Sequence, residues 1–382
     1  MNNKNLFLIF HGRFPSEKAA SLFAAKSAWA FSLHNISVTL VVPKRKGAIK
    51  EDPYDYYNIP RTFNIIYINT IDLFGINLFR NISFTISYLF FSIRTFFYVR
   101  KVSKNMDIMY SNEILPLFLL SFIRKNCFYE MHDFPESKLW IFGNFLKRMR
   151  WILIHNNWKL NETKKIFPMI PQEKYICELN AVELDSFDIP ISKDFARENL
   201  GLPRDKKIAV YTGHLYAWKG VYTLAQSADF LSDDFLLVFV GGTNEDVEKF
   251  REIYGDNKKI RIIGHVHHSD IPIWQKAADI LVLPNTLKEK ISAYYTSPMK
   301  LFEYMASKRI IVATDIPSIR EILNEKNAII VKPDDERDLD LGIEKAMNNA
   351  DKNNVLIEEA FKNVLSHTWD KRAERIINFI NK

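Results

Sequence analysis

Two segments in the second half of the chain combine residue types that can bind a phosphate. In the segment 211–220 an expected strand runs into Gly213, and Lys219 stands just before an expected helix. Glycine has no Cβ, so a ligand can approach its backbone closely. A cation beside a helix N-terminus favours an anion. This pattern predicts a phosphate site, although an ordinary turn with a solvated lysine would have the same residues.

The second segment begins at Ser297 and continues into an expected helix. Pro298 suits the first turn, where its missing N–H is not needed. Free N–H groups around Ser297 and Met299 can receive diphosphate oxygens. Lys300 and Glu303 follow on adjacent turns, and a carboxylate can accept both hydroxyls of a ribose. The alternative is a helix with a satisfied surface glutamate.

Alternating strands and helices must position these residues, which predicts parallel sheets covered by helices. Strands are expected at 6–10, 36–42, 64–68, 107–110, 126–131, 151–155, 174–178, 207–212, 235–240, 260–263, 280–283, 310–314 and 328–331. Helices are expected at 17–33, 80–103, 113–124, 138–149, 158–166, 219–230, 245–254, 270–278, 298–307, 317–324, 337–348 and 355–381.

This order predicts an α/β fold with two doubly wound, Rossmann-like parallel-sheet domains. We expect them at 1–185 and 186–360, with a linker near 179–205 and a final stretch, 361–382, that packs back on the first domain. Charge divides in the same way, since residues 1–180 hold 24 Lys and Arg against 13 Asp and Glu, and the remainder holds 28 against 32. A basic half favours phosphates or an anionic membrane. No nucleic-acid module signature is present, so nucleic acid is not an expected partner.

The helix expected at 80–103 carries apolar residues on both sides. Arg80, Arg94 and Arg100 leave fewer than the roughly 20 apolar residues that a transmembrane span needs. Two interpretations stay open: a helix buried between the sheet and a neighbour, or an element that rests on a membrane with its basic residues at lipid phosphates. The basic segment 147–151 is a second candidate for the same surface.

Several classes of protein are disfavoured. Cys127 and Cys177 lie in apolar runs, so we expect no disulfide framework. The first apolar run, 6–10, is too short for a signal peptide, and the expected location is cytoplasmic. The histidines of 265–268 lack a spaced carboxylate or thiol, so a polar loop is favoured over a metal site. The sequence holds no phosphate-binding loop of the ATPase type.

Together the two segments resemble the retaining nucleotide-sugar glycosyltransferases of the GT-B fold (family 4 type), a family that includes phosphatidylinositol mannosyltransferases and bacterial polysaccharide glycosyltransferases. The resemblance covers nearly the whole chain. Further matching parts are the first glycine loop at 10–18, a histidine segment at 129–133, the interdomain junction at 180–183 with Phe187, and strand ends at 278–284, 314–317 and 329–333.

The resemblance implies a role for individual residues. Lys219 would hold the donor diphosphate, Glu303 the ribose, and His132 would sit beside the transferred sugar, so these three form the expected catalytic set. Gly12 would let the donor approach the first domain, and Lys18 would contact phosphate or the acceptor. The other expected donor-binding residues are Gly213, His214, Val266 (near the base, through its main chain), Tyr295, Ser297, Met299, Lys300 and Leu301.

Two positions depart from the family pattern. Tyr295 stands where the first glutamate of the paired pattern is usual, and His214 stands where an arginine is usual. A neutral histidine offers one N–H donor, whereas arginine offers five and a permanent charge. The identity of the donor sugar is therefore open.

The resemblance implies a retaining glycosyltransferase of the hexosyltransferase type, with no metal and no other cofactor. Its expected donor is a nucleoside diphosphate sugar, with a UDP-sugar favoured, and its expected acceptor is a glycan or a lipid-linked acceptor. Bacterial cell-surface polysaccharide synthesis at the inner face of the cell membrane is the expected setting. The alternatives are a sugar-nucleotide epimerase of the same fold and a non-catalytic nucleotide-sugar-binding homologue.

Overall fold

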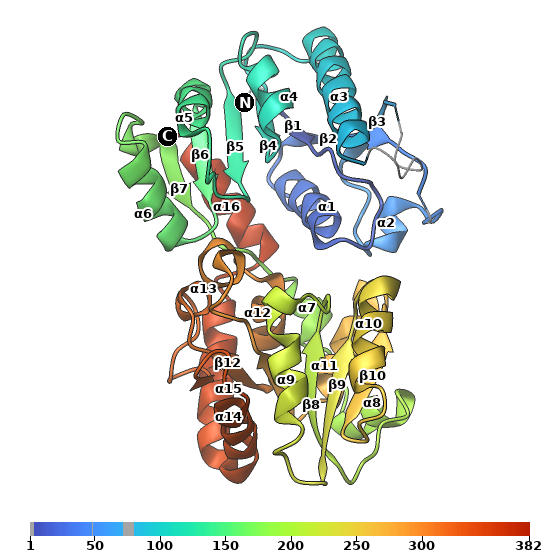
Figure 1. Cartoon of the computed structure of the whole chain (residues 1–382). Helices are drawn as coiled ribbons and strands as arrows, with labels where there is room; N and C mark the ends of the chain where they lie inside the picture. Colours follow the sequence, from blue (N-terminus) through green and yellow to red (C-terminus); the bar gives the residue numbers. More distant parts are fainter. Residues whose placement is uncertain (1–3, 48, 72–79) are drawn as a thin grey trace. The chain divides into compact units, whose positions relative to one another are not determined.

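The chain divides into two compact units, and each is described by itself (Figure 1). The computed structural model describes residues 4–47, 49–71 and 80–382, with side chains in the helix from Arg80 described from Ser83 onward. The first unit comprises residues 1–178 and 369–382, and the second comprises residues 179–368.

The first unit is built on a seven-stranded parallel sheet in the order β3-β2-β1-β4-β5-β6-β7. The order reverses between β1 and β4, and ligands of such sheets bind beyond the carboxyl ends of the strands at this switch point. The strands are β1 (Asn5–Ile9), β2 (Ser37–Lys44), β3 (Asn64–Asn69), β4 (Ile108–Ser111), β5 (Cys127–Met131), β6 (Trp151–Ile154) and β7 (Tyr175–Cys177). All seven predicted strands are confirmed, with ends that differ by a residue or two.

Helices cover this sheet. Side chains of α3, α4 and α5, among them Phe91, Leu117 and Phe145, share one buried cluster with the strand residues Ile9 and Met109. The helices are α1 (Ala19–Ser32), α2 (Pro53–Tyr56), α3 (Arg80–Val102), α4 (Ile114–Leu120), α5 (Leu139–Arg148), α6 (Asn157–Ile166), a 3-10 turn (Gln172–Lys174) and α16 (Trp369–Ile380), of which α16 packs against α1.

The second unit has a six-stranded parallel sheet in the order β10-β9-β8-β11-β12-β13, with its switch point between β8 and β11. The strands are β8 (Lys207–Thr212), β9 (Phe235–Val240), β10 (Ile260–Gly264), β11 (Ile280–Leu283), β12 (Ile310–Thr314) and β13 (Ile329–Val331). Along β8, Ile208 and Val210 enter one buried cluster, whereas Ala209 and Tyr211 enter the other. This period of two is the geometry of a strand covered on both faces.

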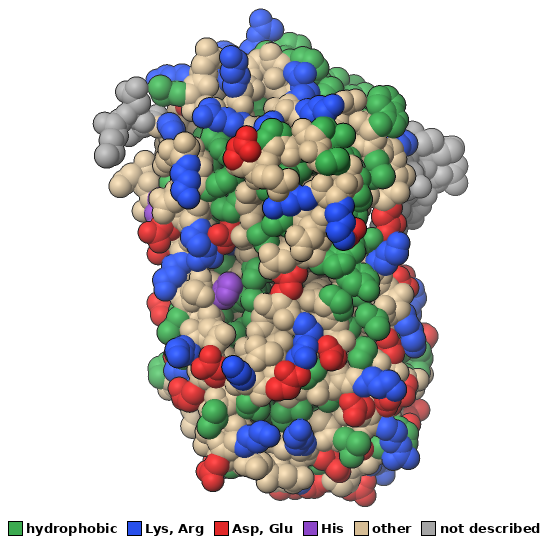
Figure 2. Space-filling model, turned by 90° about the vertical axis from the view of Figure 1, so that its left-hand side faces the viewer, with side chains coloured by type: hydrophobic (Ala, Val, Ile, Leu, Met, Phe, Trp, Pro, Cys, Tyr) green, Lys and Arg blue, Asp and Glu red, His purple; other side chains and the backbone are tan. Residues whose placement is uncertain are grey.

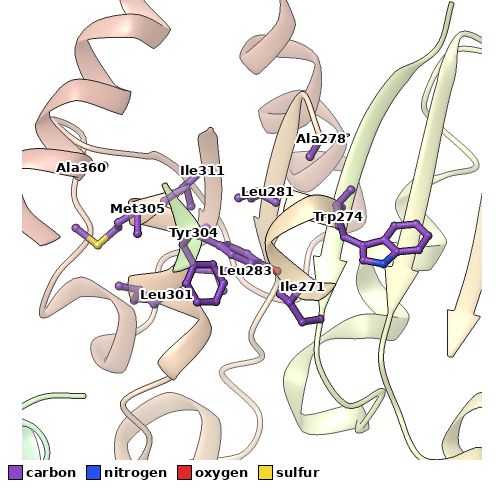
Figure 3. Packing of buried hydrophobic residues seen from close by; sticks show 14 of the residues in the cluster. Ile271, Trp274, Ala278, Leu281, Leu283, Leu301, Tyr304, Met305, Ile311 and Ala360 are labelled. Atoms are coloured by element: carbon purple, nitrogen blue, oxygen red, sulfur yellow. The ribbon is translucent and has the colours of Figure 1, made fainter. Parts of the chain in front are cut away.

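Figure 3 shows part of the first of these clusters, where Leu283 of β11 lies near Tyr304 of α12 and Ile271 of α11. The helical elements are α7 (Leu184–Phe187), α8 (Lys193–Asn199), η3 (Ala217–Lys219), α9 (Val221–Ser227), α10 (Asn244–Tyr254), η4 (His268–Asp270), α11 (Ile271–Ala277), η5 (Ile291–Tyr295), α12 (Met299–Ala306), α13 (Pro317–Arg320), α14 (Glu336–Asn348) and α15 (Ala350–Val364).

The boundaries differ from the predicted domains 1–185, 186–360 and 361–382. The chain passes from the first unit to the second after residue 178, because Val182 and Phe187 are buried in the second unit's core. The N–H of Val182 also donates to the carbonyl of His367 at 2.9 Å, which keeps the second unit closed up to residue 368. The expected linker 179–205 forms α7 and α8 instead of an open connection.

The single helix predicted at 355–381 is wrong. Residues 365–368 separate α15 from α16, and α15 packs on α12 and β12 of the second unit. Only α16 belongs to the first unit, as expected for a terminal stretch that returns. Within the described part of the chain, α3 included, we find no helix with the length and apolar character that crossing a membrane requires.

Candidate functional site

Gly213 lies at the switch point of the second unit's sheet. It directly follows β8 and has a φ of +122°, a backbone conformation that residues other than glycine rarely adopt. A Cβ at this position would lie 3.7 Å from the Nζ of Lys300 and 3.8 Å from the Nζ of Lys219. Two amines, one of which was predicted to bind phosphate and the other to bind the donor, therefore meet at one glycine.

The two amines lie in surroundings that disfavour their charge. Burial lowers the pKa of Lys219 to about 8, with Asp246 opposing the shift. Burial, and then the charge of Lys219, hold the pKa of Lys300 well below its usual range. The Nζ of Lys300 donates to the carbonyl of Thr212 at 3.1 Å and lies 3.6 Å from the ring centre of Tyr211. A bound diphosphate carries at least two negative charges and would therefore stabilise the charged form of both amines.

Lys219 is held in place by a second glycine. Gly220 follows η3 with a φ of +72°, and a Cβ there would lie 1.8 Å from the carbonyl oxygen of Pro284 at the end of β11. Only a residue without a side chain lets the loop after β8 contact the loop after β11 this closely. The contact places Lys219 on the crevice side of both strands at the switch point.

Glu303 is buried on α12, as its predicted role requires. Its Oε1 lies 3.0 Å from the Nε2 of His268, which belongs to η4 and packs edge-on against Phe187. The prediction treated His268 as part of a polar loop and missed it as the partner of this carboxylate. The run of histidines at 265–268 was the available signal, but sequence spacing alone does not show that it meets α12.

The ring of His214 does not take the place of the arginine that is usual at this position. The ring stacks on Tyr216 at 4.9 Å between centres, and its Nδ1 lies 3.8 Å from a carboxylate oxygen of Asp246. The main-chain carbonyl of His214 accepts a hydrogen bond from the hydroxyl of Tyr211 at 2.7 Å. The positive charge near Gly213 is therefore supplied by the two lysines.

The remaining predicted donor residues take different places around α12. Ser297 precedes the helix, and its Oγ accepts from the N–H of Asn180 at 3.2 Å. Met299 is the first residue of α12, and Tyr295 is the last of η5. The side chain of Leu301 is buried in the core, and its N–H donates to the carbonyl of Pro298 at 3.1 Å, so its donor contact stays a prediction. Val266 packs partly buried against the same core.

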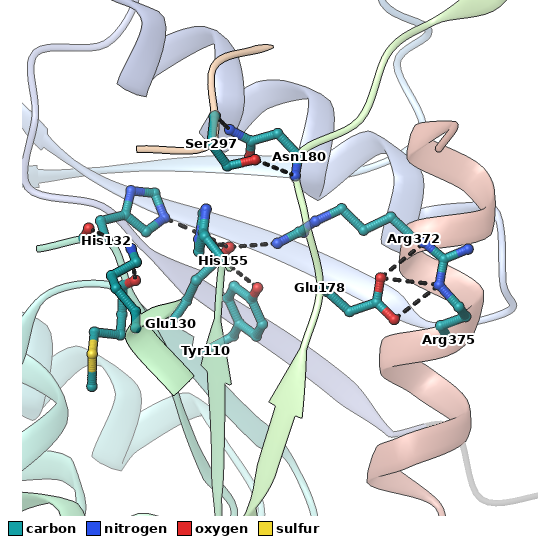
Figure 4. Close-up of polar contacts among 11 residues, drawn as sticks. Tyr110, Glu130, His132, His155, Glu178, Asn180, Ser297, Arg372 and Arg375 are labelled. Carbon is teal, nitrogen blue, oxygen red and sulfur yellow. Dashed lines mark hydrogen bonds and ion pairs between the residues drawn. The ribbon is translucent and has the colours of Figure 1, made fainter. Parts of the chain in front are cut away.

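In the first unit, His132 belongs to a buried polar cluster (Figure 4). The carboxylate of Glu130 lies 2.6 Å from Arg372 of α16, 2.8 Å from the Nε2 of His155 and 3.6 Å from the Nε2 of His132. The hydroxyl of Tyr110 donates to the same carboxylate. Burial alone would raise the pKa of Glu130, but the guanidinium and the two imidazoles hold it well below the usual range. Glu130 thus orients the His132 ring.

The main-chain carbonyl of His132 is already occupied. The buried ammonium of Lys159 donates to it at 3.0 Å and to the carbonyl of Met131 at 3.2 Å. The side chain of His132 is about a quarter exposed, at 25%. The ring of His132 is therefore open to a ligand in part, whereas one lone pair of its carbonyl is already used.

Glu130, His132 and His155 offer ligand atoms within 4.8 Å of one another, a grouping that can hold a metal ion. The guanidinium of Arg372 lies 2.6 Å from the same carboxylate oxygen that would bind the ion. Two cations at that distance repel strongly in a buried setting. The cluster is better described as an ion pair of Glu130 and Arg372 that positions His132 and His155.

The two remaining predicted residues of the first unit lie near the end of β1. A Cβ on Gly12 would lie 2.1 Å from the ring of Phe10, so this glycine has a packing role as well. Lys18 is exposed and directly precedes α1.

Sequence reasoning missed a group at the first unit's switch point. Arg45 contacts the ring of His11, and the main-chain N–H of His11 donates to the carboxylate of Glu113 at 3.1 Å. Burial, followed by Arg45, lowers the pKa of His11 to about 3. The signal was positional, because His11, Arg45 and Glu113 each follow closely on the carboxyl end of β1, β2 or β4.

Residues 192–363 match the family described as "Glycosyl transferases group 1". This part of the chain is therefore similar to the group 1 glycosyltransferase domains. The matched range contains Gly213, Lys219, Lys300 and Glu303.

Two curated relatives carry related activities in their names. A putative teichuronic acid biosynthesis glycosyltransferase, TuaC, of Bacillus subtilis is 26% identical over 142 residues, which are 37% of this chain and 33% of that protein. A D-inositol 3-phosphate glycosyltransferase of Xylanimonas cellulosilytica is 28% identical over 115 residues, 27% of this chain and 28% of that protein. The chain spans about a third of the length of the curated relatives it matches.

Solved structures resemble the whole chain. Sucrose-phosphate synthase from Thermosynechococcus elongatus has a TM-score of 0.78 at 15% identity, covering 99% of this chain and 98% of that one. Anabaena Alr3699/HepE in complex with UDP has a TM-score of 0.74 at 15% identity, covering 99% of each chain. At these identities the likeness concerns the fold, which confirms the predicted GT-B architecture of two parallel-sheet α/β domains.

Proposed function

We propose that this protein transfers a sugar from a nucleoside diphosphate sugar to an acceptor, and that the second unit binds the donor. The observation that carries the proposal is the meeting of Lys219 and Lys300 at Gly213, beyond the carboxyl end of β8. A phosphate pair can approach the backbone there and receive both amines. The Anabaena structure of the same fold is described with UDP and with UDP-glucose, which supports a UDP-sugar as donor.

The chemistry follows from where charge develops. When the sugar leaves, negative charge builds on the diphosphate, and the two amines together with the N–H groups of the first turn of α12 stabilise it. Glu303, held by His268, receives the ribose hydroxyls. In this scheme the neutralising charges come from the protein, and no metal ion or other cofactor takes part.

His132 has the role of contacting the transferred sugar through its ring. Glu130, 3.6 Å from the Nε2 of that ring, restrains it, so that the ring can form a hydrogen bond with a hydroxyl of the sugar. Retention of the anomeric configuration and a hexose as the transferred group remain proposals that rest on the resemblance of the sequence to retaining enzymes of this family.

For the acceptor, we propose a glycan or a lipid-linked sugar of a bacterial cell-surface polysaccharide, handled at the inner face of the cell membrane. The name of the Bacillus relative, which refers to teichuronic acid biosynthesis, supports this class. Charge supports it too, since the first unit carries 28 Lys and Arg against 15 Asp and Glu. Figure 2 shows blue Lys and Arg side chains spread over that unit, which is drawn at the top.

The experiment compares UDP-sugar consumption by the purified chain with and without a lipid-linked glycan acceptor. A transferase consumes donor and releases UDP mainly when the acceptor is present. An epimerase converts or hydrolyses the donor without it, and a non-catalytic binder shows UDP binding by calorimetry with no turnover. The last two outcomes contradict the proposal.

Two variants test the site itself. Lys219→Ala is expected to lower turnover by roughly 100-fold, because a buried charge contact to the leaving group is lost. Lys258→Ala, which changes an exposed lysine of the same unit, is the matched control and is expected to keep the wild-type rate. Equal rates for the two variants would rule out the diphosphate role of Lys219.

A further inference from the structure

Helix α3 of the first unit buries hydroxyl side chains beside Phe91 and Val99 and exposes several large apolar side chains. Its buried positions include Ser87, Ser92 and Thr95, each without measurable exposure. A surface helix ordinarily turns its apolar stripe inward and its polar side chains to water. The exposed apolar side chains of α3 include Leu89, Phe90, Ile93 and Phe97, with exposed fractions of 46%, 40%, 41% and 60%.

Ser87 ties α3 to the rest of the unit. Its hydroxyl accepts a hydrogen bond from Arg45 at 3.2 Å. The main-chain carbonyl of Ser87 also accepts from the hydroxyl of Thr70 at 3.2 Å. These bonds fix the rotation of α3 about its axis, so the apolar side chains cannot turn inward without breaking them.

The outward residues form one stripe. Leu89, Ile93, Phe97 and Arg100 follow one another at intervals of three or four residues, which places them on one side of a helix. Figure 1 shows α3 at the edge of the unit, with α4 beside it. An exposed contiguous apolar stripe of this kind marks a surface that meets another partner or a lipid phase.

Charge identifies which partner fits. Arg94, Arg100 and Lys101 are exposed on the same helix. Between residues 73 and 106 the sequence holds five Lys and Arg and no Asp or Glu. A second copy docking through the same stripe would bring these cations together. An anionic lipid surface offers phosphates to the cations and acyl chains to the apolar side chains.

We propose that this stripe, Leu89, Phe90, Ile93 and Phe97 with the flanking Arg94, Arg100 and Lys101, docks the protein on an anionic lipid bilayer with α3 lying in the plane of its surface. The stripe is a different surface from the donor site, whose lysines and Glu303 belong to the second unit. The inference deepens the proposed membrane setting of the function, but it does not depend on donor binding.

Co-sedimentation with lipid vesicles tests the inference. The full chain is mixed with vesicles of phosphatidylcholine alone and with vesicles that also contain phosphatidylglycerol. Binding is expected to the second kind and to weaken with added salt. The variant Leu89→Gln/Ile93→Gln/Phe97→Gln is expected to lose roughly tenfold or more of its partitioning. The variant Arg94→Gln/Arg100→Gln/Lys101→Gln is expected to lose its preference for the anionic vesicles.

The matched control is Ile253→Gln/Val355→Gln, which changes two apolar side chains of the second unit that are 61% and 67% exposed. It is expected to bind vesicles as the wild type does. Thermal melting checks that each variant is folded, and calorimetry with UDP reports the donor site separately. Loss of UDP binding with intact vesicle binding would count against the donor proposal alone.

Three outcomes overturn the inference. The first is equal vesicle binding by the wild type and the apolar triple variant. The second is equal binding to neutral and anionic vesicles. The third is a wild-type dimer in sedimentation velocity that the triple variant abolishes, with no vesicle binding by either protein, because the stripe would then serve a second copy of the chain.

Discussion

The guanidinium of Arg372 lies 2.6 Å from the carboxylate of Glu130, although 242 positions separate them in the sequence. Both side chains are almost fully buried, with 2% and 1% of their surface exposed. Arg375, one turn further along α16, makes a two-pronged contact with Glu178 at 2.8 Å for each nitrogen. Helix α16 thus belongs to the first unit, and its Arg372 supplies the positive charge of the cluster that contains His132.

Replacing Arg372 by Met is expected to destabilise the first unit by about 3–5 kcal/mol, because Glu130 would remain as an unpaired buried charge. Urea unfolding at pH 7 measures this loss. The double variant Glu130→Gln/Arg372→Met removes both charges and is expected to recover most of the stability. A double variant no more stable than Arg372→Met would show that the pair is not the cause.

The affinity for UDP is expected to depend on pH through Lys219. In the free protein its pKa is lowered to about 8, and a bound diphosphate favours the charged form and raises that pKa. Below pH 8 the amine of Lys219 is already mostly charged, so this residue adds no pH dependence there. As the pH rises above about 8, binding must be accompanied by proton uptake, so the affinity falls until the pKa of the bound state is reached.

Calorimetry in buffers of different ionisation enthalpy measures this proton uptake directly. Lys219→Arg keeps the charge at every pH in question and is expected to show no uptake at this position. A wild-type affinity that stays flat between pH 7 and pH 9.5 would contradict the assignment.

Alanine substitutions at three glycines with positive φ distinguish the cost of backbone strain from the cost of a steric clash. A Cβ on Gly201, at +60°, meets nothing within 4 Å, so Gly201→Ala is expected to cost about 1 kcal/mol from the backbone alone. Gly220→Ala places its Cβ 1.8 Å from a Pro284 carbonyl and is expected to cost several times more. Gly213→Ala has room in the folded chain but occupies the phosphate position, and is expected to lower UDP affinity at least tenfold.

Urea unfolding and UDP titration on these variants distinguish the roles. Gly201→Ala must leave UDP affinity at the wild-type value for the comparison to hold. If Gly213→Ala binds UDP as tightly as Gly201→Ala does, the diphosphate does not lie against Gly213.

The carboxylate of Glu303 is expected to accept hydrogen bonds from the ribose hydroxyls. The wild type should bind UDP more tightly than 2′-deoxy-UDP by roughly tenfold, as expected for a hydrogen bond to a charged group. Glu303→Ala should bind both nucleotides with one weaker affinity. His268→Ala leaves the carboxylate in place but removes its partner, so an intermediate preference is expected. A full preference for UDP in Glu303→Ala would remove Glu303 from the ribose site.

Much of the fold followed from local pattern. Runs such as Phe235–Val240 are apolar throughout, and a strand covered on both faces needs this composition, so every predicted strand is present. Gly213, Lys219 and Glu303 were also recognisable, because residue type and position relative to a strand end or a helix start carry their chemistry.

Contacts between distant segments were decided by the tertiary structure. The pairing of Arg372 with Glu130, of His268 with Glu303, and of Lys300 with Lys219 depends on how elements far apart in the sequence pack. The exposed apolar side chains of α3 show the same limit. Its sequence indicates a helix with apolar residues on several sides, and only the bonds of Ser87 to Arg45 and Thr70 determine which side faces water. Periodicity specifies which residues share a face, whereas packing against the rest of the chain specifies what that face meets.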